Sequence, residues 1–202
     1  MHRFTQEELR FLDTLSTPTK IQDYLDSIPF NFEEDGETCM SPRRVLRTQK
    51  AHCIEGGMLA AVALMRQGEK PLLLNLKVDK QDDDHVVALY RRNGYWGAIS
   101  KTNHAVLRFR DPVYKTIREL AMSYFHEYFL VADGTKTMKG FSLPINLRRF
   151  GTAWMTKEED LWNIAETIYD SQHKAAIPKG NSRFIRNAGS LEQEAADIPE
   201  YA

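Results

Sequence analysis

The sequence contains only two cysteines, Cys39 and Cys53, among its 202 residues. Two are too few for a disulfide framework or for a zinc site built from cysteines, so we expect two free thiols. No apolar stretch approaches the roughly 18 residues that a transmembrane helix needs, and the N-terminal residues lack the basic-then-apolar pattern of a secretory signal. We therefore expect a cytoplasmic protein without a membrane partner.

Neither sign of charge is in excess, because 27 basic residues stand against 28 acidic ones. This balance excludes the broad basic field of a nucleic-acid-binding protein. No P-loop and no GxGxxG stretch occurs, and we predict no cofactor. Asp82, Asp83, Asp84 and His85 are possible ligands of a hard cation, but consecutive residues cannot all converge on one ion, so we predict no metal site.

The hydrophobic content of 42% is sufficient for one domain, which we expect over residues 1–176. Helical patterns occupy residues 1–50, a mixed region follows over 48–110, and helices are expected again over 111–176, starting at Asp111-Pro112 and at Thr156. Residues 105–109 are a candidate fourth strand. Periodicity is lost over 177–202, which predicts an extended or disordered tail. The predicted fold class is α+β.

The central region places Cys53 at the start of a run that is apolar nearly all round, residues 53–65, which predicts a buried helix. Strand patterns follow at 71–78, 85–90 and 95–100, with connections short enough for an antiparallel sheet packed on that helix. A thiol at a helix N-terminus feels the positive end of the helix dipole. The pKa of such a thiol is lowered and its sulfur becomes a better nucleophile.

Three features carry a resemblance to a known family: Cys53 at the helix start, His85 located 32 residues later at the start of a strand, and the hairpin strand Tyr95–Ser100. Together they resemble the core of the transglutaminase-like superfamily, whose fold is related to papain-like cysteine proteases. The resemblance implies a buried cysteine-bearing helix on an antiparallel sheet, with a cysteine nucleophile, a histidine base and an acidic third residue. It covers Thr48–Asn103, about a quarter of the chain.

The third position differs from the family pattern, because counting from the hairpin reaches Ser100 where the family has an aspartate. A hydroxyl can accept a hydrogen bond from imidazole, but it brings no charge to stabilise imidazolium. Asn103 would be the papain-like substitute. Ala51 also replaces the glycine that usually stands two residues before the cysteine.

Two further residues are candidates for contact with the substrate. The backbone amide of Cys53 and the side chain of Gln49 could donate to an oxyanion. Trp96 could form a substrate wall, although a tryptophan in a hairpin more often packs in the core. In the same way, Cys53 could be a core residue and His85 a surface histidine at a turn.

We therefore expect cysteine-dependent acyl transfer at an amide bond. Cys53 would attack the carbonyl, His85 would carry the proton, and a thioester would be resolved by water or by an amine. Hydrolysis of a peptide, isopeptide or other amide is favoured over transamidation, because water is always present. The partner would be a peptide or another amide-containing substrate.

A basic group precedes the cysteine, and it is either a solvated helix face or a patch that attracts an acidic substrate. Its members are Arg43, Arg44, Arg47 and Lys50. Two other functions are kept open. The first is a binding module with the same fold that has lost its chemistry, for which Ser100 is the best support. The second is a partner protein that uses the tail, residues 190–202, as a recognition segment.

Overall fold

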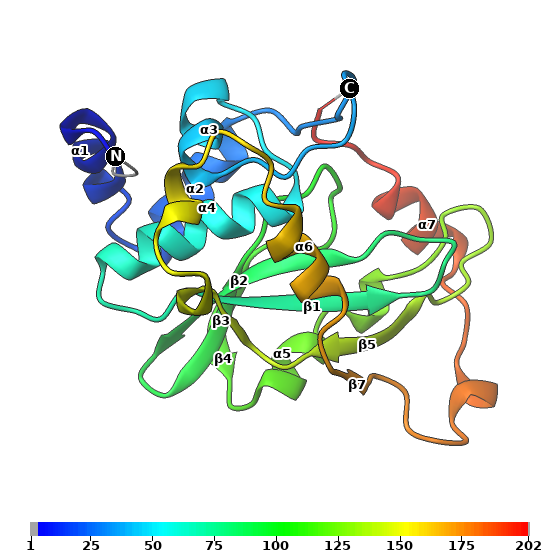
Figure 1. Cartoon of the computed structure of the whole chain (residues 1–202). Coiled ribbons are helices and arrows are strands. Elements are labelled where there is room, and N and C mark those ends of the chain that lie inside the picture. The colour runs from blue at the N-terminus through cyan, green and yellow to red at the C-terminus, as the bar shows by residue number, and fades with distance from the viewer. Residues whose placement is uncertain (1–3, 202) are drawn as a thin grey trace.

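A mixed arrangement of helices and an antiparallel sheet forms the protein, as Figure 1 shows for this computed structural model. The structure describes residues 4–201, and in them the sheet has seven strands in the order β4-β3-β2-β1-β5-β7, with β6 paired to β1. Every strand pairing is antiparallel. The strands are β1 (Leu72–Val78), β2 (His85–Arg92), β3 (Tyr95–Ile99), β4 (Arg110–Tyr114), β5 (Met138–Ser142), β6 (Ile145–Asn146) and β7 (His173–Ala175). The α+β class is confirmed.

The helices of the first half lie where the sequence predicts helical patterns, and the last of them begins at Cys53 as expected. They are α1 (Gln6–Thr14), α2 (Pro18–Ser27), α3 (Pro42–Thr48) and α4 (Cys53–Arg66). Thr5 and Glu8 form a capping box, and the side chains of Thr17 and Ser41 cap helices that start with proline. No helix within residues 4–201 is both long and apolar enough to cross a bilayer.

Helix α4 is buried between the N-terminal helices and one face of the sheet (Figure 1). Its residues Ile54 to Leu64 are all buried, as its apolar sequence predicts. The opposite face of the sheet carries a second hydrophobic core, formed with α5 (Ile117–Met122) and the 3-10 helix Phe125–Glu127. Strand β2 is therefore covered on both faces, which explains why its first six residues, His85 to Tyr90, are all buried.

The second half of the chain differs from the prediction at several points. Asp111 and Pro112 lie in strand β4, which pairs with β3, and the following helix α5 starts only after Thr116, whose side chain caps it. Residues 105–109 form a loop rather than the fourth strand. Thr156 belongs to a short 3-10 helix, and α6 (Trp162–Tyr169) begins later. Residues 111–176 thus contain strands as well as helices, because pairing with the sheet overrides local helix signals.

The C-terminal segment is folded in its described part, which corrects the expectation of an extended or disordered tail. It contains helix α7 (Ser190–Ala196) and then returns toward the N-terminal helices (Figure 1). The Ala105 amide donates to the Ile198 carbonyl (3.0 Å), and the Glu200 amide donates to the Asn103 carbonyl (2.8 Å). The segment therefore covers the loop that follows β3.

Candidate active site

Cys53 is the first residue of α4, and its side chain is partly exposed where two cavities of about 490 Å³ each meet. The preceding residue, His52, has extended backbone, and its amide donates to the Glu55 carboxylate at 3.0 Å. That bond satisfies one amide at the helix start. The Cys53 amide lies in the first turn, where no intrahelical acceptor exists, and so it is suited to an external oxygen.

His85 is the first residue of β2 and is buried, with only 6% of its surface exposed. The pairing of β2 with β3 brings Ser100 next to it, so that His85 Nε2 lies 2.7 Å from Ser100 Oγ. The Ser100 hydroxyl donates its proton to the Leu107 carbonyl at 2.5 Å. Because a hydroxyl has one proton, Ser100 must accept from Nε2–H, and the lone pair of neutral His85 is then on Nδ1.

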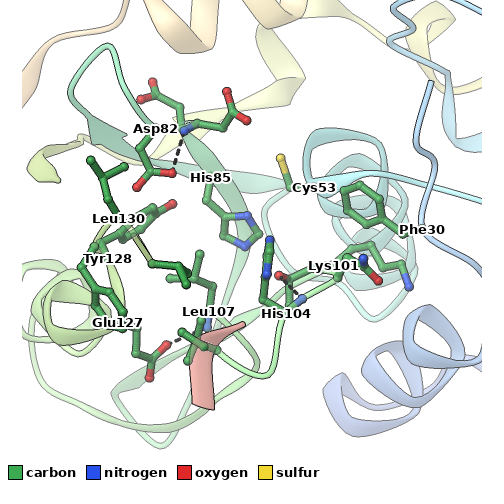
Figure 2. Close-up of a pocket in the computed structure, with 18 of the residues that line it drawn as sticks. Phe30, Cys53, Asp82, His85, Lys101, His104, Leu107, Glu127, Tyr128 and Leu130 are labelled. Carbon is green, nitrogen blue, oxygen red and sulfur yellow. Dashed lines mark hydrogen bonds between the residues drawn. The ribbon is translucent and has the colours of Figure 1, made fainter. Parts of the chain in front are cut away.

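The Cys53 thiol interacts with two imidazoles, those of His52 and His85. Figure 2 shows Cys53 and His85 side by side at one cavity. Burial alone would raise the pKa of the thiol, but the two imidazoles outweigh it and lower the pKa of Cys53 from its usual 9.0 to about 5. Cys53 is therefore a thiolate at neutral pH.

His52 was not among the predicted site residues. Its Nε2 lies 3.0 Å from the Thr38 carbonyl, 3.4 Å from Glu55 Oε1 and 3.6 Å from Glu33 Oε1. Three acceptors around one nitrogen require that it carries a proton. Burial lowers the pKa of His52, but its interactions with Cys53 and Glu55 outweigh burial and raise it to about 11. His52 is thus an imidazolium between a carboxylate and a thiolate.

Glu55 was missed as well, and it organises this side of the site. Its side chain is fully buried and accepts four hydrogen bonds. The donors are the Thr38 hydroxyl (2.7 Å), the Met40 amide (2.8 Å), the His52 amide (3.0 Å) and Asn31 Nδ2 (3.1 Å). Burial raises the pKa of Glu55, but the His52 imidazole and the backbone amides of Met40 and His52 lower it below its usual value, so the group is ionised. The sequence signal was the capping-box spacing between His52 and Glu55.

Two predicted residues lie away from the site. Gln49 ends α3 in the left-handed conformation (φ 55°), and its amide donates to the Tyr24 hydroxyl (3.0 Å) and the Leu46 carbonyl (2.5 Å). The oxyanion role proposed for Gln49 is therefore wrong in this geometry. Trp96 packs against the core on the other face of the sheet, with the Arg91 guanidinium 5.3 Å from its ring, so it forms no substrate wall.

Asn103 lines the cavity but does not orient His85. Its side-chain oxygen accepts from the Tyr201 amide (2.8 Å), and its side-chain nitrogen donates to the Tyr201 carbonyl (3.0 Å). The orienting contact comes from Ser100 instead, at the position where the family resemblance expects an acid. Of the six predicted residues, the structure brings together Cys53, His85 and Ser100.

The three arginines of the basic group before the cysteine are paired with carboxylates outside the two cavities. Arg43 binds Glu8 (3.1 Å), Arg44 binds Asp160 (2.6 Å) and Arg47 binds Glu158 (2.9 Å). The group therefore gives no geometric basis for an acidic substrate. Within residues 4–201, no cluster of three or more His, Cys, Asp or Glu side chains is arranged to hold a metal ion.

No protein-family model matches the sequence, and the search of curated proteins gives no match either. Any functional conclusion therefore depends on the chemistry of the residues around Cys53.

Proposed function

We propose that the protein catalyses cysteine-dependent acyl transfer at an amide bond, with a transglutaminase-like or papain-like arrangement of Cys53, His85 and Ser100. The supporting observation is that Cys53 and His85 line the same cavity, with the Nε2 atom of the His85 imidazole 2.7 Å from Ser100 Oγ. Nucleophilic catalysis by cysteine requires this order of groups: a thiol, a base within reach of it, and a group that orients the base.

The order of secondary-structure elements supports the same proposal. A buried helix that starts with the nucleophile packs on an antiparallel sheet, and one central strand of that sheet starts with the base. This is the arrangement that the transglutaminase-like resemblance implies. Because both residues occupy the first position of a buried element, their relative positions are determined by rigid packing rather than by loops.

In the proposed reaction, the Cys53 sulfur attacks the carbonyl carbon of the amide, and the carbonyl oxygen becomes an oxyanion. The Cys53 amide at the N-terminus of α4 stabilises that charge. Protonated His85 then transfers a proton to the amide nitrogen, the carbon–nitrogen bond breaks, and an amine leaves a thioester on Cys53. Water or another amine, deprotonated by neutral His85, attacks the thioester and restores the thiolate.

His52 and Glu55 explain how this chemistry can proceed without an acid at Ser100. A carboxylate beside the base would stabilise the thiolate–imidazolium pair, and Ser100 brings no such charge. In this chain the buried charge lies on the other side of the sulfur, where Glu55 holds His52 as an imidazolium. The free thiolate therefore has His52 as a cationic partner before it attacks the amide and again after the thioester has been resolved.

The proposal predicts an unusual pH dependence for alkylation of Cys53. Iodoacetamide reacts with thiolate, so the rate rises with pH through the pKa of Cys53, at a midpoint near pH 5 rather than near 9. Peptide mapping by mass spectrometry identifies the labelled residue, and Cys53→Ala is the control. Cys39 contributes little, because burial raises the pKa of its thiol to about 12.

Turnover is tested with p-nitrophenyl acetate as a generic acyl donor. We expect a hydroxylamine-sensitive acetyl group on Cys53 and a slower acetylation in His85→Ala. An alkylation midpoint near 9, or acetyl groups found only on other residues, would reject the enzyme. Either result would favour the alternative function, in which the protein is a binding module of the same fold without catalytic activity.

A further inference from the structure

The two cavities that meet at Cys53 share four other lining residues, Phe30, Phe32, Asp83 and Asp84. One cavity extends past His85 toward Tyr128, and the other extends past His52 toward Tyr169. Cys53 thus lies between two spaces rather than at the bottom of one. A substrate bound across Cys53 would occupy both spaces, and its leaving amine would lie on the side of His85, which protonates it.

Carboxylates without a cationic partner line both spaces. Asp82, Asp83 and Asp84 lie beside His85, and Figure 2 shows Asp82 on the cavity wall next to His85. Their hydrogen-bond partners are neutral: the Thr137 hydroxyl binds Asp82 (2.5 Å), and Asn75 Nδ2 binds Asp84 (2.9 Å). No ion pair of these three aspartates occurs within residues 4–201, although the described arginines and lysines elsewhere form several.

Carboxylates also line the second cavity. Glu37, Asp83 and Asp84 form no ion pair within residues 4–201, whereas Glu33 lies 3.6 Å from the His52 imidazole, and none of the described residues that line this cavity is a lysine or an arginine. Exposed aromatic side chains complete its wall: Phe32 is 50% exposed, Trp162 42% and Tyr169 37%. Carboxylates combined with exposed aromatic faces are the chemistry that binds ammonium and guanidinium groups.

Within residues 4–201, Lys101 is the only lysine that lines the first cavity, and it forms no ion pair with the three aspartates. Lys101 is buried and its Nζ donates to the Ile28 carbonyl at 2.7 Å, while the Tyr201 ring lies 4.8 Å from the same nitrogen. The local excess of negative charge therefore persists in a protein whose net charge is only −1. An anionic wall does not assist a thiolate nucleophile, because like charges repel, so its chemical use is toward the substrate.

A second observation, an unpaired buried hydroxyl, points to a polar ligand in the same space. The Tyr128 hydroxyl is buried and has no hydrogen-bond partner, although Tyr128 lines the cavity with Cys53, Asp82 and Asp84. Its side chain is only 2% exposed. Leaving a buried hydroxyl unpaired costs about 1–3 kcal/mol, so a bound polar group that pairs with it would stabilise the complex.

We infer that the substrate of Cys53 carries a positively charged group, an alkylammonium or a guanidinium, next to the amide that is cleaved or exchanged. This inference rests on the proposed function and names the substrate class. Asp83 and Asp84 border both spaces, so they can attract the charge from either side of the sulfur. The inferred charge is opposite to that of the acidic substrate that one of the two interpretations of the basic group allowed.

Charged thiol reagents test the inference directly. Three methanethiosulfonates with the same reactive group carry trimethylammonium, hydroxyethyl or sulfonate substituents. In each case the Cys53 sulfur bonds to the sulfenyl sulfur of the reagent, the sulfur–sulfur bond of the reagent breaks, and methanesulfinate leaves. For each reagent, the rate of reaction with Cys53 is divided by its rate of reaction with the thiolate of 2-mercaptoethanol. This ratio corrects for differences in intrinsic reactivity among the reagents.

We expect the cationic reagent to modify Cys53 about tenfold faster than the anionic one after this correction, and we expect added salt to reduce the ratio. The double variant Asp83→Asn/Glu37→Gln should lower the ratio at least about threefold, because both side chains are exposed and uncharged replacements keep their shape. Asp23→Asn is the matched control, an exposed aspartate on α2 outside both cavities.

Equal corrected rates for the three reagents, or a ratio unchanged in the double variant, would overturn the inference while leaving a reactive thiol in place. A neutral reagent that modifies Cys53 no faster than it modifies 2-mercaptoethanol at pH 6 would instead reject the proposed function. The two failures are therefore distinguishable in one series of measurements.

Discussion

At the scale of single residues, the site is a row of groups with alternating charge. Glu55 is anionic, His52 is cationic, Cys53 is anionic, and His85 follows with Ser100 behind it. Glu55 and the Cys53 thiolate each stabilise the ionised form of His52, and His52 stabilises theirs, so removing one of these groups changes the next. The two histidines therefore have different roles: His52 brings a charge next to the sulfur, and His85, whose orienting partner is the neutral Ser100, is the proposed base.

The variant Glu55→Gln tests the role of that charge. The amide cannot hold His52 as an imidazolium, so the thiolate loses its cationic neighbour and the pKa of Cys53 rises. We expect the alkylation midpoint to move up by at least about one pH unit. The rate at pH 6 falls as a consequence, while the rate at pH 10 is preserved.

Glu34→Gln is the control for this measurement, since Glu34 is exposed and lies outside both cavities. Urea unfolding of both variants measures their stability, so a loss of stability can be distinguished from a change in the pKa of Cys53. An unchanged midpoint in Glu55→Gln would show that His85 alone sets the ionisation of Cys53.

At the scale of elements, α4 determines where the nucleophile lies, and two glycines in its first turns allow its close packing. A Cβ added to Gly56 would lie 2.6 Å from Lys101 Cβ, which follows Ser100 directly in the chain. A Cβ added to Gly57 would meet Leu73 Cδ2 at 3.4 Å, an ordinary contact. The two positions therefore differ in sterics but share a helical environment.

We expect Gly56→Ala to destabilise the protein by about 1–3 kcal/mol, because the overlap with Lys101 outweighs the gain in helix propensity. Gly57→Ala, the matched control, should change stability little or raise it by up to about 1 kcal/mol. Urea unfolding curves give both values. Equal free energies of unfolding for the two variants would contradict the predicted overlap between a Cβ at position 56 and Lys101.

At the scale of the whole molecule, the C-terminal segment holds the loop that orients the base. Residues 198–201 bind the backbone and side chain of Asn103 and the backbone of Ala105, and the same loop presents the Leu107 carbonyl to Ser100. The Tyr201 hydroxyl also donates to the Asp26 carbonyl at 2.5 Å, which ties the segment to α2. A segment folded in this way is already engaged, which argues against its use as a free recognition tail.

Deleting residues 190–202 should loosen this loop. The Ala105 amide loses its acceptor, the Ile198 carbonyl, and we expect its hydrogen exchange to accelerate by at least about tenfold, since a solvent-exposed loop amide opens readily. The Ala176 amide, which donates to Lys139 on the other side of the sheet, serves as the internal control. Unchanged exchange at Ala105 would show that the loop holds its conformation alone.

Local sequence signals predicted the first half of the fold well and the second half poorly. The caps at Thr5, Thr17 and Ser41 are satisfied within one helical turn, so the sequence nearby is sufficient to identify them. The helix expected at Asp111-Pro112 failed because that stretch pairs with β3, a partner that local spacing does not reveal. The prediction of an extended or disordered tail was wrong for the same reason, since hydrogen bonds of this segment join it to residues about a hundred positions away in the sequence.

The sequence by itself determined that Cys53 begins a buried helix and that His85 begins a strand, because periodicity and strand pattern report burial within each element. Only the tertiary structure decided which groups surround the sulfur. The hairpin register places Ser100 within hydrogen-bond distance of His85. Gln49 and Asn103 bind other partners instead of the site. Thr38, Met40 and Asn31 donate hydrogen bonds to the buried Glu55. Charges act through space, so the groups that ionise this thiol are set by packing between segments and not by their order along the chain.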